Sequence, residues 1–163
     1  MTSGSHSGAE VARTYYVLIG LPGAGKSAWA AQQARCVVVS RDEVRRFLYE
    51  NRFGQGDDEA VFREVLKLRV REGDADVVID ACHAYRRERV GVVETIRCSE
   101  TRLDFRVVGV LFDVPWDVCL ARNESLAPDA RVPAPDMQRL RAALRANDPK
   151  TEGVFDQVLV VRE

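Results

Sequence analysis

The sequence contains no long hydrophobic run. None of its apolar stretches approaches the roughly 20 residues that a membrane-spanning helix requires. Its opening residues include Ser, Gly and His and lack the apolar segment of a signal peptide. We therefore expect a cytoplasmic protein without membrane contact, in which residues 1–12 form a flexible leader and residues 13–163 form one folded domain.

Cysteine is scarce and scattered. The four cysteines lack the paired spacing of a zinc site or a disulfide framework: Cys36, Cys82, Cys98 and Cys119. This pattern predicts reduced thiols, as in a cytosolic protein.

Net charge is also small, at -1, so the chain lacks the global basic field that drives non-specific binding to nucleic acid. Any contact with a polyanion must therefore be local. Nearly all the positive residues are arginines, because lysine occurs only as Lys26, Lys67 and Lys150. Arginine suits bidentate contacts with phosphate, and a solvated helix face is the alternative explanation for most of these side chains.

Short β-branched apolar runs alternate with helix-length amphipathic segments. This alternation predicts an α/β fold with a central parallel sheet covered by helices on both faces. The expected strands are Tyr15–Ile19, Cys36–Val39, Val77–Ile79, Phe105–Phe112 and Val158–Val161. The expected helices are Lys26–Ala34, Asp42–Glu50, Asp58–Arg71, Arg86–Cys98, Trp116–Ala121 and Asp136–Ala146.

Two stretches interrupt this alternation. Phe53–Asp57 contains a glycine and predicts a connector between two helices. Asn123–Pro135 contains three prolines and is long enough to form a mobile lid over a site, with a plain surface connection as the alternative.

The strongest motif follows the first expected strand and opens the first expected helix. Glycines there let backbone N–H groups approach phosphate oxygens, and the helix adds the positive end of its dipole. Lys26 is expected to reach the β- and γ-phosphates of ATP or another NTP, and Ser27 to ligate Mg²⁺. The alternative is a chance glycine turn. The motif fits GxxxxGK[ST] at every fixed position and consists of Gly20, Leu21, Pro22, Gly23, Ala24, Gly25, Lys26 and Ser27.

Further charged side chains are expected at the carboxyl edge of the sheet, where open α/β sheets bind ligands. Asp80 ends the third strand and is expected to hold the Mg²⁺ shell or to orient an acceptor, unless it caps the next turn. Ser40 and Glu43 form a capping box that starts a helix. In that helix, Asp42 is expected to take the proton of an acceptor hydroxyl and Arg45 to bind a substrate phosphate. The alternative is an acid favoured by the helix dipole beside a solvated arginine.

Three further side chains are candidates for the same site. Arg122 precedes the proline-bearing stretch and Arg131 lies within it; both are candidates to neutralise charge on a transferring phosphoryl group, with solvated arginines as the alternative. His83 follows the Asp80 strand and is a candidate acceptor contact, although a lone histidine is more often structural.

Five strings occur along the chain in a fixed order: GLPGAGKSAWA, SRDEVR, VVIDA, LFDVPW, and ARN followed by RVP. In these strings the chain resembles the 5′-hydroxyl polynucleotide kinases of phage and bacterial end-healing enzymes. The resemblance extends from Tyr15 to Ala146, and the DVPW string at Asp113–Trp116 is more distinctive than the P-loop itself. It implies a P-loop kinase with a lid, which moves the γ-phosphate of ATP to a 5′-OH end of DNA or RNA.

The resemblance also implies roles for single positions. Lys26 and Ser27 match the phosphate and magnesium residues, and Arg122 matches an arginine that contacts the nucleotide phosphates. On the acceptor side, the matches are Asp42 as general base, Arg45 as the contact to the acceptor's neighbouring phosphate, and Asp80 as an acidic residue near the acceptor.

Three departures from the family pattern concern the substrate rather than the reaction. Leu126 stands where a second lid arginine is usual, which leaves Arg131 as its candidate replacement. The lid carries Glu124 and Asp129 where basic residues are common. Ala81–His83 follow Asp80 where family members tend to place Thr and Asn.

Two other function classes compete with a polynucleotide kinase. The acidic lid and the near-neutral charge favour a kinase of a small hydroxyl substrate or of an aminoacyl-tRNA. The absence of any partner domain in so short a chain favours a nucleotide-binding switch or scaffold. The sequence specifies neither DNA over RNA nor an oligomeric state.

Overall fold

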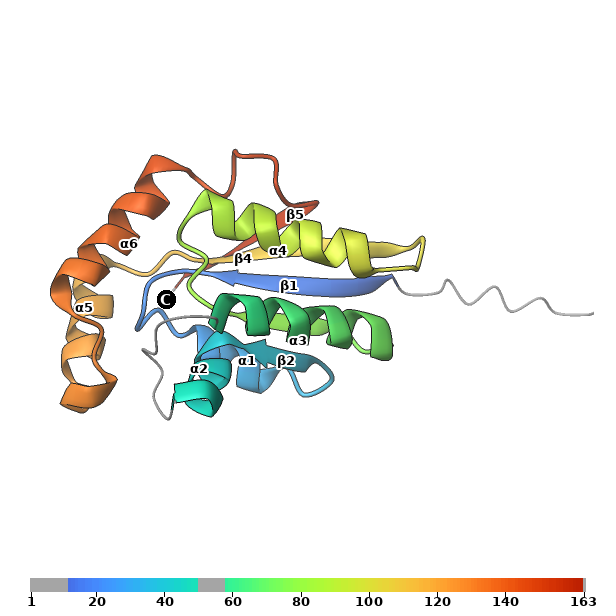
Figure 1. Cartoon of the computed structure of the whole chain (residues 1–163). Helices are drawn as coiled ribbons and strands as arrows, with labels where there is room; N and C mark the ends of the chain where they lie inside the picture. Colours follow the sequence, from blue (N-terminus) through green and yellow to red (C-terminus); the bar gives the residue numbers. More distant parts are fainter. Residues whose placement is uncertain (1–11, 50–57, 163) are drawn as a thin grey trace, which may run out of the picture.

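Five strands form one parallel sheet in the order β2-β3-β1-β4-β5 (Figure 1). The computed structural model describes residues 12–49 and 58–162. The predicted leader up to residue 11 and the predicted connector Phe53–Asp57 lie outside the described residues. The strands are β1 Arg13–Ile19, β2 Val37–Ser40, β3 Val77–Asp80, β4 Phe105–Phe112 and β5 Gln157–Val161.

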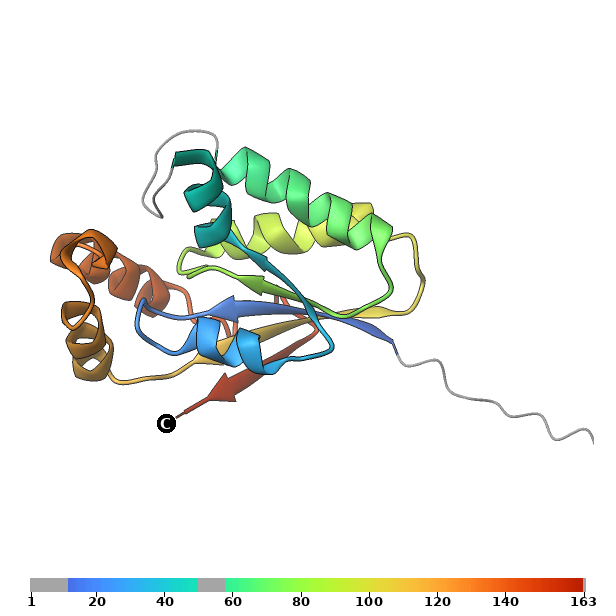
Figure 2. The ribbon, with the colours of Figure 1, turned by 90° about the horizontal axis from the view of Figure 1, so that it is seen from below.

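Helices cover both faces of the sheet, as the alternating sequence pattern predicts. Figure 2 shows α1 on one face and α3 with α4 on the opposite face, while α5 and α6 lie beyond the ends toward which the strands point. The helices are α1 Lys26–Gln32, α2 Arg41–Tyr49, α3 Asp58–Glu72, α4 Arg86–Ser99, α5 Trp116–Glu124 and α6 Ala134–Ala146.

The core is divided by the sheet into two apolar clusters. Side chains of β1 alternate between them: Tyr15 and Val17 pack toward α3 and α4, whereas Leu18 packs in the cluster that contains Ala30 of α1. Because both faces of β1 and β3 are covered, all four residues of β3 are buried. This explains why the central strands have continuous apolar sequences.

The predicted lid is shorter than its proline content suggests. The stretch Asn123–Pro135 was expected to be one loop, but α5 runs on to Glu124 and α6 already begins at Ala134. A short 3₁₀ helix, Pro128–Ala130, lies between them. The Asn123 side-chain amide donates to the Val132 carbonyl at 2.8 Å and accepts from the Val132 N–H at 2.9 Å. Pro135 is tolerated in the first turn of α6, where a backbone N–H has no helical partner.

The strand register brings the ends of β2 and β3 together. Ser40 pairs with Asp80 as the last pair between these strands, and α2 starts at the next residue, Arg41. β1 lies between β3 and β4, so the loop that leaves β1 emerges between the carboxyl ends of those two strands.

Candidate active site

The P-loop leaves β1 and is shaped by two glycines. Gly23 and Gly25 have φ angles of +83° and +92°, in the left-handed region where a Cβ is strained. A Cβ on Gly23 would also lie only 2.7 Å from the Cys119 carbonyl oxygen of α5. The loop therefore packs directly against α5, and its Gly20 N–H donates to the Cys82 carbonyl at 3.0 Å on the other side.

Lys26 begins α1 and is buried inside the curve of this loop. Its Nζ donates to the Leu21 carbonyl at 2.7 Å. The ammonium group is thereby held close to the loop backbone, where the lysine of a GxxxxGK[ST] motif contacts the β- and γ-phosphates.

Ser27 and Asp80 form the part of the site that suits a divalent cation. The Ser27 hydroxyl donates to Oδ2 of Asp80 at 2.8 Å, close to the spacing of about 3 Å between neighbouring ligands of an octahedral Mg²⁺. No cluster of three or more His, Cys, Asp or Glu side chains in the described ranges could hold a metal. This pair fits Mg²⁺, which takes one or two protein oxygens and completes its shell with substrate phosphates and water.

Asp80 is a buried carboxylate with charged neighbours of both signs. Burial raises its pKa, the Ser27 hydrogen bond and the Lys26 charge oppose that shift, and the charges of Asp42 and Glu43 add to it. The charge of Asp42 reaches Asp80, because α2 begins next to the carboxyl end of β3. A cation bound beside Asp80 would favour its ionised form.

α2 positions Asp42 and Arg45 beside the end of β3. The Glu43 N–H donates to Oγ of Ser40 at 3.3 Å, which supplies one of the two bonds of the predicted capping box. Asp42 is 48% exposed and forms an ion pair with Nη1 of Arg45 at 3.9 Å. Its carboxylate is therefore accessible to a substrate at the sheet edge.

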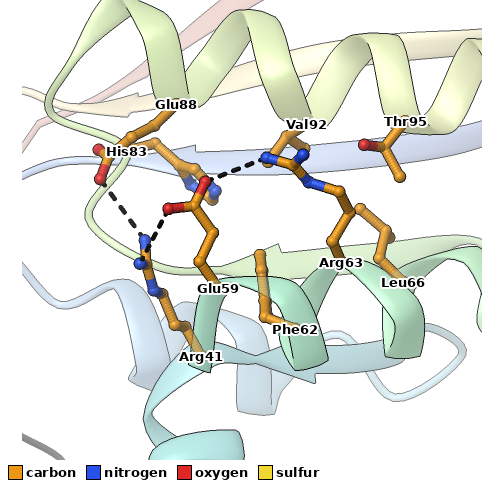
Figure 3. Close-up of a pocket in the computed structure, with 9 residues that line it drawn as sticks. All are labelled: Arg41, Glu59, Phe62, Arg63, Leu66, His83, Glu88, Val92 and Thr95. Atoms are coloured by element: carbon orange, nitrogen blue, oxygen red, sulfur yellow. Dashed lines mark hydrogen bonds and ion pairs between the residues drawn. The ribbon is translucent and has the colours of Figure 1, made fainter. Parts of the chain in front are cut away.

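A residue that the sequence pattern did not reveal holds Arg45 in place. Asp58, at the start of α3, is 5% exposed and accepts from Nε of Arg45 at 2.9 Å and from Nε of Arg41 at 3.2 Å. Arg41 also pairs with Glu59 and, across the helices, with Glu88 of α4 (Figure 3). An acidic residue at a helix start is common in sequences, and only the fold shows that this one bridges two arginines of α2.

The two arginines around the lid lie in different surroundings. Arg122 of α5 reaches the P-loop, where its Nη1 donates to the Gly23 carbonyl at 3.0 Å. Arg131 is exposed, and its Nε donates to the Leu126 carbonyl within the lid itself at 2.6 Å. Arg122 therefore lies beside the phosphate-binding loop, whereas Arg131 lies on the lid.

His83, a candidate acceptor contact in the sequence, lies in the core and is only 3% exposed. Its ring nitrogen Nδ1 lies 2.6 Å from the Leu18 carbonyl, which can only accept, so Nδ1 carries the hydrogen. Nε2 is buried without a partner. His83 also lines a cavity of about 20 Å³ beside Arg41 and Glu88 (Figure 3), large enough for about one water molecule. Its position is that of a structural histidine, so we leave it out of the acceptor site.

The buried His83 is expected to make the fold sensitive to acid. Burial, with the nearby positive charges, lowers its pKa from 6.5 to about 4, despite the opposing hydrogen bond to Leu18. The unfolded chain therefore takes up a proton that the folded chain excludes. The contribution of the neutral, buried His83 to stability is complete above pH 6.5 and is lost as pH falls toward 4. Between pH 7.5 and pH 5 we expect a loss of about 2 kcal/mol from this group.

Denaturant unfolding at pH 7.5 and pH 5 measures this loss. The comparison variant is His83→Asn, because asparagine tolerates the φ of +45° found here. Its free energy of unfolding should fall by about 2 kcal/mol less over this interval than that of the wild type. Equal losses in the two proteins would show that His83 is not the group responsible.

None of the helices in residues 12–49 and 58–162 combines the length and the apolar character needed to cross a bilayer.

A protein family described as AAA domain matches residues 16–148, which include the P-loop, Asp42, Asp80 and Arg122. The chain belongs to this AAA domain family. No curated protein sequence matches the chain.

Solved structures related to this AAA domain have the same fold at low sequence identity. One chain of the Pnkp1/Rnl/Hen1 RNA repair complex is 19% identical, with a TM-score of 0.73 over 90% of this chain and 48% of that chain. Kti12 from Chaetomium thermophilum, in complex with ADP-AlF3, is 15% identical, with a TM-score of 0.61 over 91% and 88% of the two chains. A sugar kinase from Janibacter sp. HTCC2649 is 17% identical, with a TM-score of 0.60 over 92% and 85%.

These likenesses establish the P-loop kinase fold of the AAA domain. The predicted parallel sheet with flanking helices is confirmed. The chain spans about half the length of the RNA repair protein, and the similar structures include proteins named for different substrates. The acceptor must therefore be inferred from the side chains of this site.

Proposed function

We propose that the chain is a polynucleotide 5′-hydroxyl kinase, which transfers the γ-phosphate of ATP to a 5′-OH end of DNA or RNA. The observation that carries the proposal is the Asp42–Arg45 pair beside Asp80, at the sheet edge next to the P-loop. A carboxylate and a phosphate-binding arginine on one helical turn suit an acceptor with a hydroxyl and a nearby phosphate. A polynucleotide end has both groups, whereas a nucleoside or simple sugar has only the hydroxyl.

Each side chain then has a distinct task. Asp42 accepts the proton of the 5′ hydroxyl as its oxygen attacks the γ-phosphorus, and Arg45 holds the neighbouring phosphate of the acceptor. Lys26 and Arg122 stabilise negative charge on the donor phosphates, and Arg131 of the lid is the further candidate for this role. Ser27 and Asp80 would hold Mg²⁺, which supplies charge neutralisation when bound.

Phosphate transfer from labelled ATP tests this proposal directly. The acceptors to compare are 5′-OH DNA, 5′-OH RNA, 3′-nucleotides and nucleosides. We expect product with oligonucleotides and with 3′-nucleotides, which carry the phosphate that Arg45 recognises, and much less with nucleosides. Absence of product with both DNA and RNA ends rejects the proposal.

A kinase of a small hydroxyl substrate or of an aminoacyl-tRNA is the second candidate. It is favoured by the exposed Glu124 and Asp129, which place negative charge on the lid where a polyanion would be repelled. The structural likeness to a sugar kinase is compatible with it. In the same screen this candidate predicts transfer to small alcohols or to charged tRNA while 5′-OH oligonucleotides remain inert.

Asp58 is expected to act as a positioning residue for the acceptor. Asp58→Ala removes the carboxylate that fixes Nε of Arg45 and of Arg41. Because Arg45 then samples other rotamers, the KM for a 5′-OH oligonucleotide should rise about tenfold while the KM for ATP stays unchanged.

The matched control is Glu59→Gln, which changes the neighbouring carboxylate. Glu59 pairs with Arg41 and Arg63, whereas Nε of Arg45 pairs with Asp58. Nucleoside acceptors, which offer Arg45 no phosphate, should be affected little by Asp58→Ala. An equal rise in the KM for ATP, oligonucleotides and nucleosides would indicate a general loss of structure and contradict the positioning role.

A further inference from the structure

The ring nitrogen Nε2 of His83 carries a lone pair that requires a hydrogen-bond donor. Nδ1 holds the ring hydrogen, because it lies 2.6 Å from the Leu18 carbonyl, so Nε2 can only accept. His83 is 3% exposed, and within residues 12–49 and 58–162 its Nε2 lacks a hydrogen-bond partner. Because an unsatisfied buried acceptor is costly, this nitrogen indicates a donor that does not belong to the polypeptide.

The cavity that His83 lines has the size of a single water molecule. Its volume is about 20 Å³, and one water needs about 10–15 Å³. His83 lies at the buried end of the cavity, whereas Glu59 and Arg63 of α3 are about half-exposed on its solvent side (Figure 3). A solvent molecule can therefore enter beside α3 and reach the histidine ring.

Arg41, the first residue of α2, lines the same cavity and makes two long ion pairs there. Its Nη1 lies 3.5 Å from Oε1 of Glu88, and its Nη2 lies 3.8 Å from Oε2 of Glu59. Charge-assisted hydrogen bonds are about 2.7–2.9 Å long, and polar groups more than about 3.5 Å apart are commonly bridged by water. The guanidinium therefore has N–H groups to share with a ligand in the cavity.

The charges around the cavity select a neutral ligand. Glu59 and Glu88 repel an anion, and Arg41 and Arg63 repel a cation. The ligand must donate one hydrogen to Nε2 of His83 and accept a hydrogen from Arg41. Water does both, and its second hydrogen has the Glu88 carboxylate as an acceptor.

We propose that this cavity binds one ordered water molecule, which donates to Nε2 of His83 and accepts from the Arg41 guanidinium. The Leu18 carbonyl, His83, the water and Arg41 then form one chain of hydrogen bonds. This chain runs from β1, two residues before Gly20 of the P-loop, to the start of α2, next to Asp42. His83 is thus a positioning residue, which fixes α2 relative to the strand that carries the phosphate-binding loop.

A high-resolution crystal structure of the full chain tests the water site directly. We expect a density peak about 2.7–3.2 Å from Nε2 of His83 and from a guanidinium nitrogen of Arg41. His83→Asn should lose this peak, because the shorter amide can still donate to the Leu18 carbonyl but does not extend to the place of Nε2. Asparagine also tolerates the φ of +45° at this position. An empty cavity in the wild type, or a direct bond between Nε2 and a protein atom, overturns the proposal.

Amide hydrogen exchange tests the positioning role without any substrate. In His83→Asn the amides of α2 should exchange about fivefold faster, because Arg41 loses a contact that holds the start of the helix. The matched control is Thr95→Val at the far end of the cavity (Figure 3), since the Thr95 hydroxyl donates to the Gly91 carbonyl at 2.8 Å. Exchange in His83→Asn that accelerates no more in α2 than in β4, or no more than in Thr95→Val, overturns the positioning role.

Kinetics separate this inference from the proposed function, on which only its effect on the acceptor rests. If a 5′-OH end is the acceptor, His83→Asn should raise the KM for that end about fivefold and leave the KM for ATP unchanged. The reason is that Arg41 and Arg45 share the carboxylate of Asp58. In an active 5′-kinase, an unchanged KM for the end contradicts the positioning role. A wild-type protein that phosphorylates no 5′-OH end removes the proposed acceptor, while the density peak and the exchange rates still decide this inference.

Discussion

Asp42→Asn is expected to lower kcat for transfer to a 5′-OH end by about 10²–10⁴-fold, because the amide cannot take the proton of the attacking hydroxyl. Affinity for ATP should stay unchanged. Asp42 lies in the first turn of α2, on the proposed acceptor side, and its charge raises the pKa of Asp80. Neutralising Asp42 therefore favours the ionised form of Asp80 and does not weaken the place where Mg²⁺ would be held.

Steady-state kinetics on 5′-OH oligonucleotides and equilibrium binding of ATP measure the two effects separately. The control is Glu43→Gln, which removes the neighbouring negative charge in the same first turn of α2. Like Asp42, Glu43 acts on the pKa of Asp80. A loss of activity caused only by removing negative charge near Asp80 should therefore appear in Glu43→Gln as well. Activity retained in this control assigns the loss in Asp42→Asn to proton transfer. Unchanged kcat in Asp42→Asn would remove Asp42 as the general base.

Arg89→Met is expected to cost about 3–5 kcal/mol of stability. Arg89 is fully buried, and its guanidinium makes two bonds to the carboxylate of Glu152, at 2.6 and 2.7 Å. It also donates to the carbonyls of His83 and Ala84 in the loop after β3, and to that of Asn147 after α6. Methionine fills similar space but leaves a buried carboxylate and three carbonyls without these donors.

Thermal unfolding should show the loss of stability in Arg89→Met as a decrease in Tm of roughly 10 °C for a chain of this length. Arg97→Met on the same helix is the matched control, because Arg97 and its partner Asp156 are both exposed and such pairs contribute less than about 1 kcal/mol. The double variant Arg89→Met with Glu152→Leu should recover much of the loss, since it no longer buries an unpaired charge. A decrease no larger than that of Arg97→Met would contradict this account.

Arg89 also connects stability to the site. Two of the carbonyls that it binds, those of His83 and Ala84, directly follow Asp80–Cys82, and the Cys82 carbonyl accepts from the Gly20 N–H of the P-loop. The same guanidinium ties this loop to α4 and to Glu152 before β5. The loop beside the phosphate-binding site is thus supported by a buried ion pair rather than by local turn geometry alone.

Much of the fold was predictable because its signals are local. Within residues 12–49 and 58–162, apolar runs and amphipathic periodicity predicted the five strands and the six α-helices, with ends that differ from the observed ones by a few residues at most. The P-loop was equally clear, since glycines at fixed spacing, a lysine and a serine carry its chemistry within eight residues. Asp80 and Asp42 could be placed at one edge because parallel strands end on the same side of the sheet.

Other features depended on residues far apart in the chain. Nothing in the sequence near Asp58 indicates that it holds Arg41 and Arg45, 17 and 13 residues away. The lid was predicted too long, because the hydrogen bonds of Asn123 with Val132 close it. His83 was assigned to the acceptor from its place after Asp80, but its backbone turns its ring into the core.

The sequence by itself determined the order of elements, the phosphate-binding loop and the edge of the sheet on which the chemistry lies. These follow from periodicity and short motifs, which act over a few residues. Only the tertiary structure decided that Asp58 supports Arg45, that Arg89 pairs with Glu152, and that His83 and Arg41 line one cavity. Those contacts join elements that meet only when the sheet is complete, so their energy is a property of the packed fold rather than of any segment.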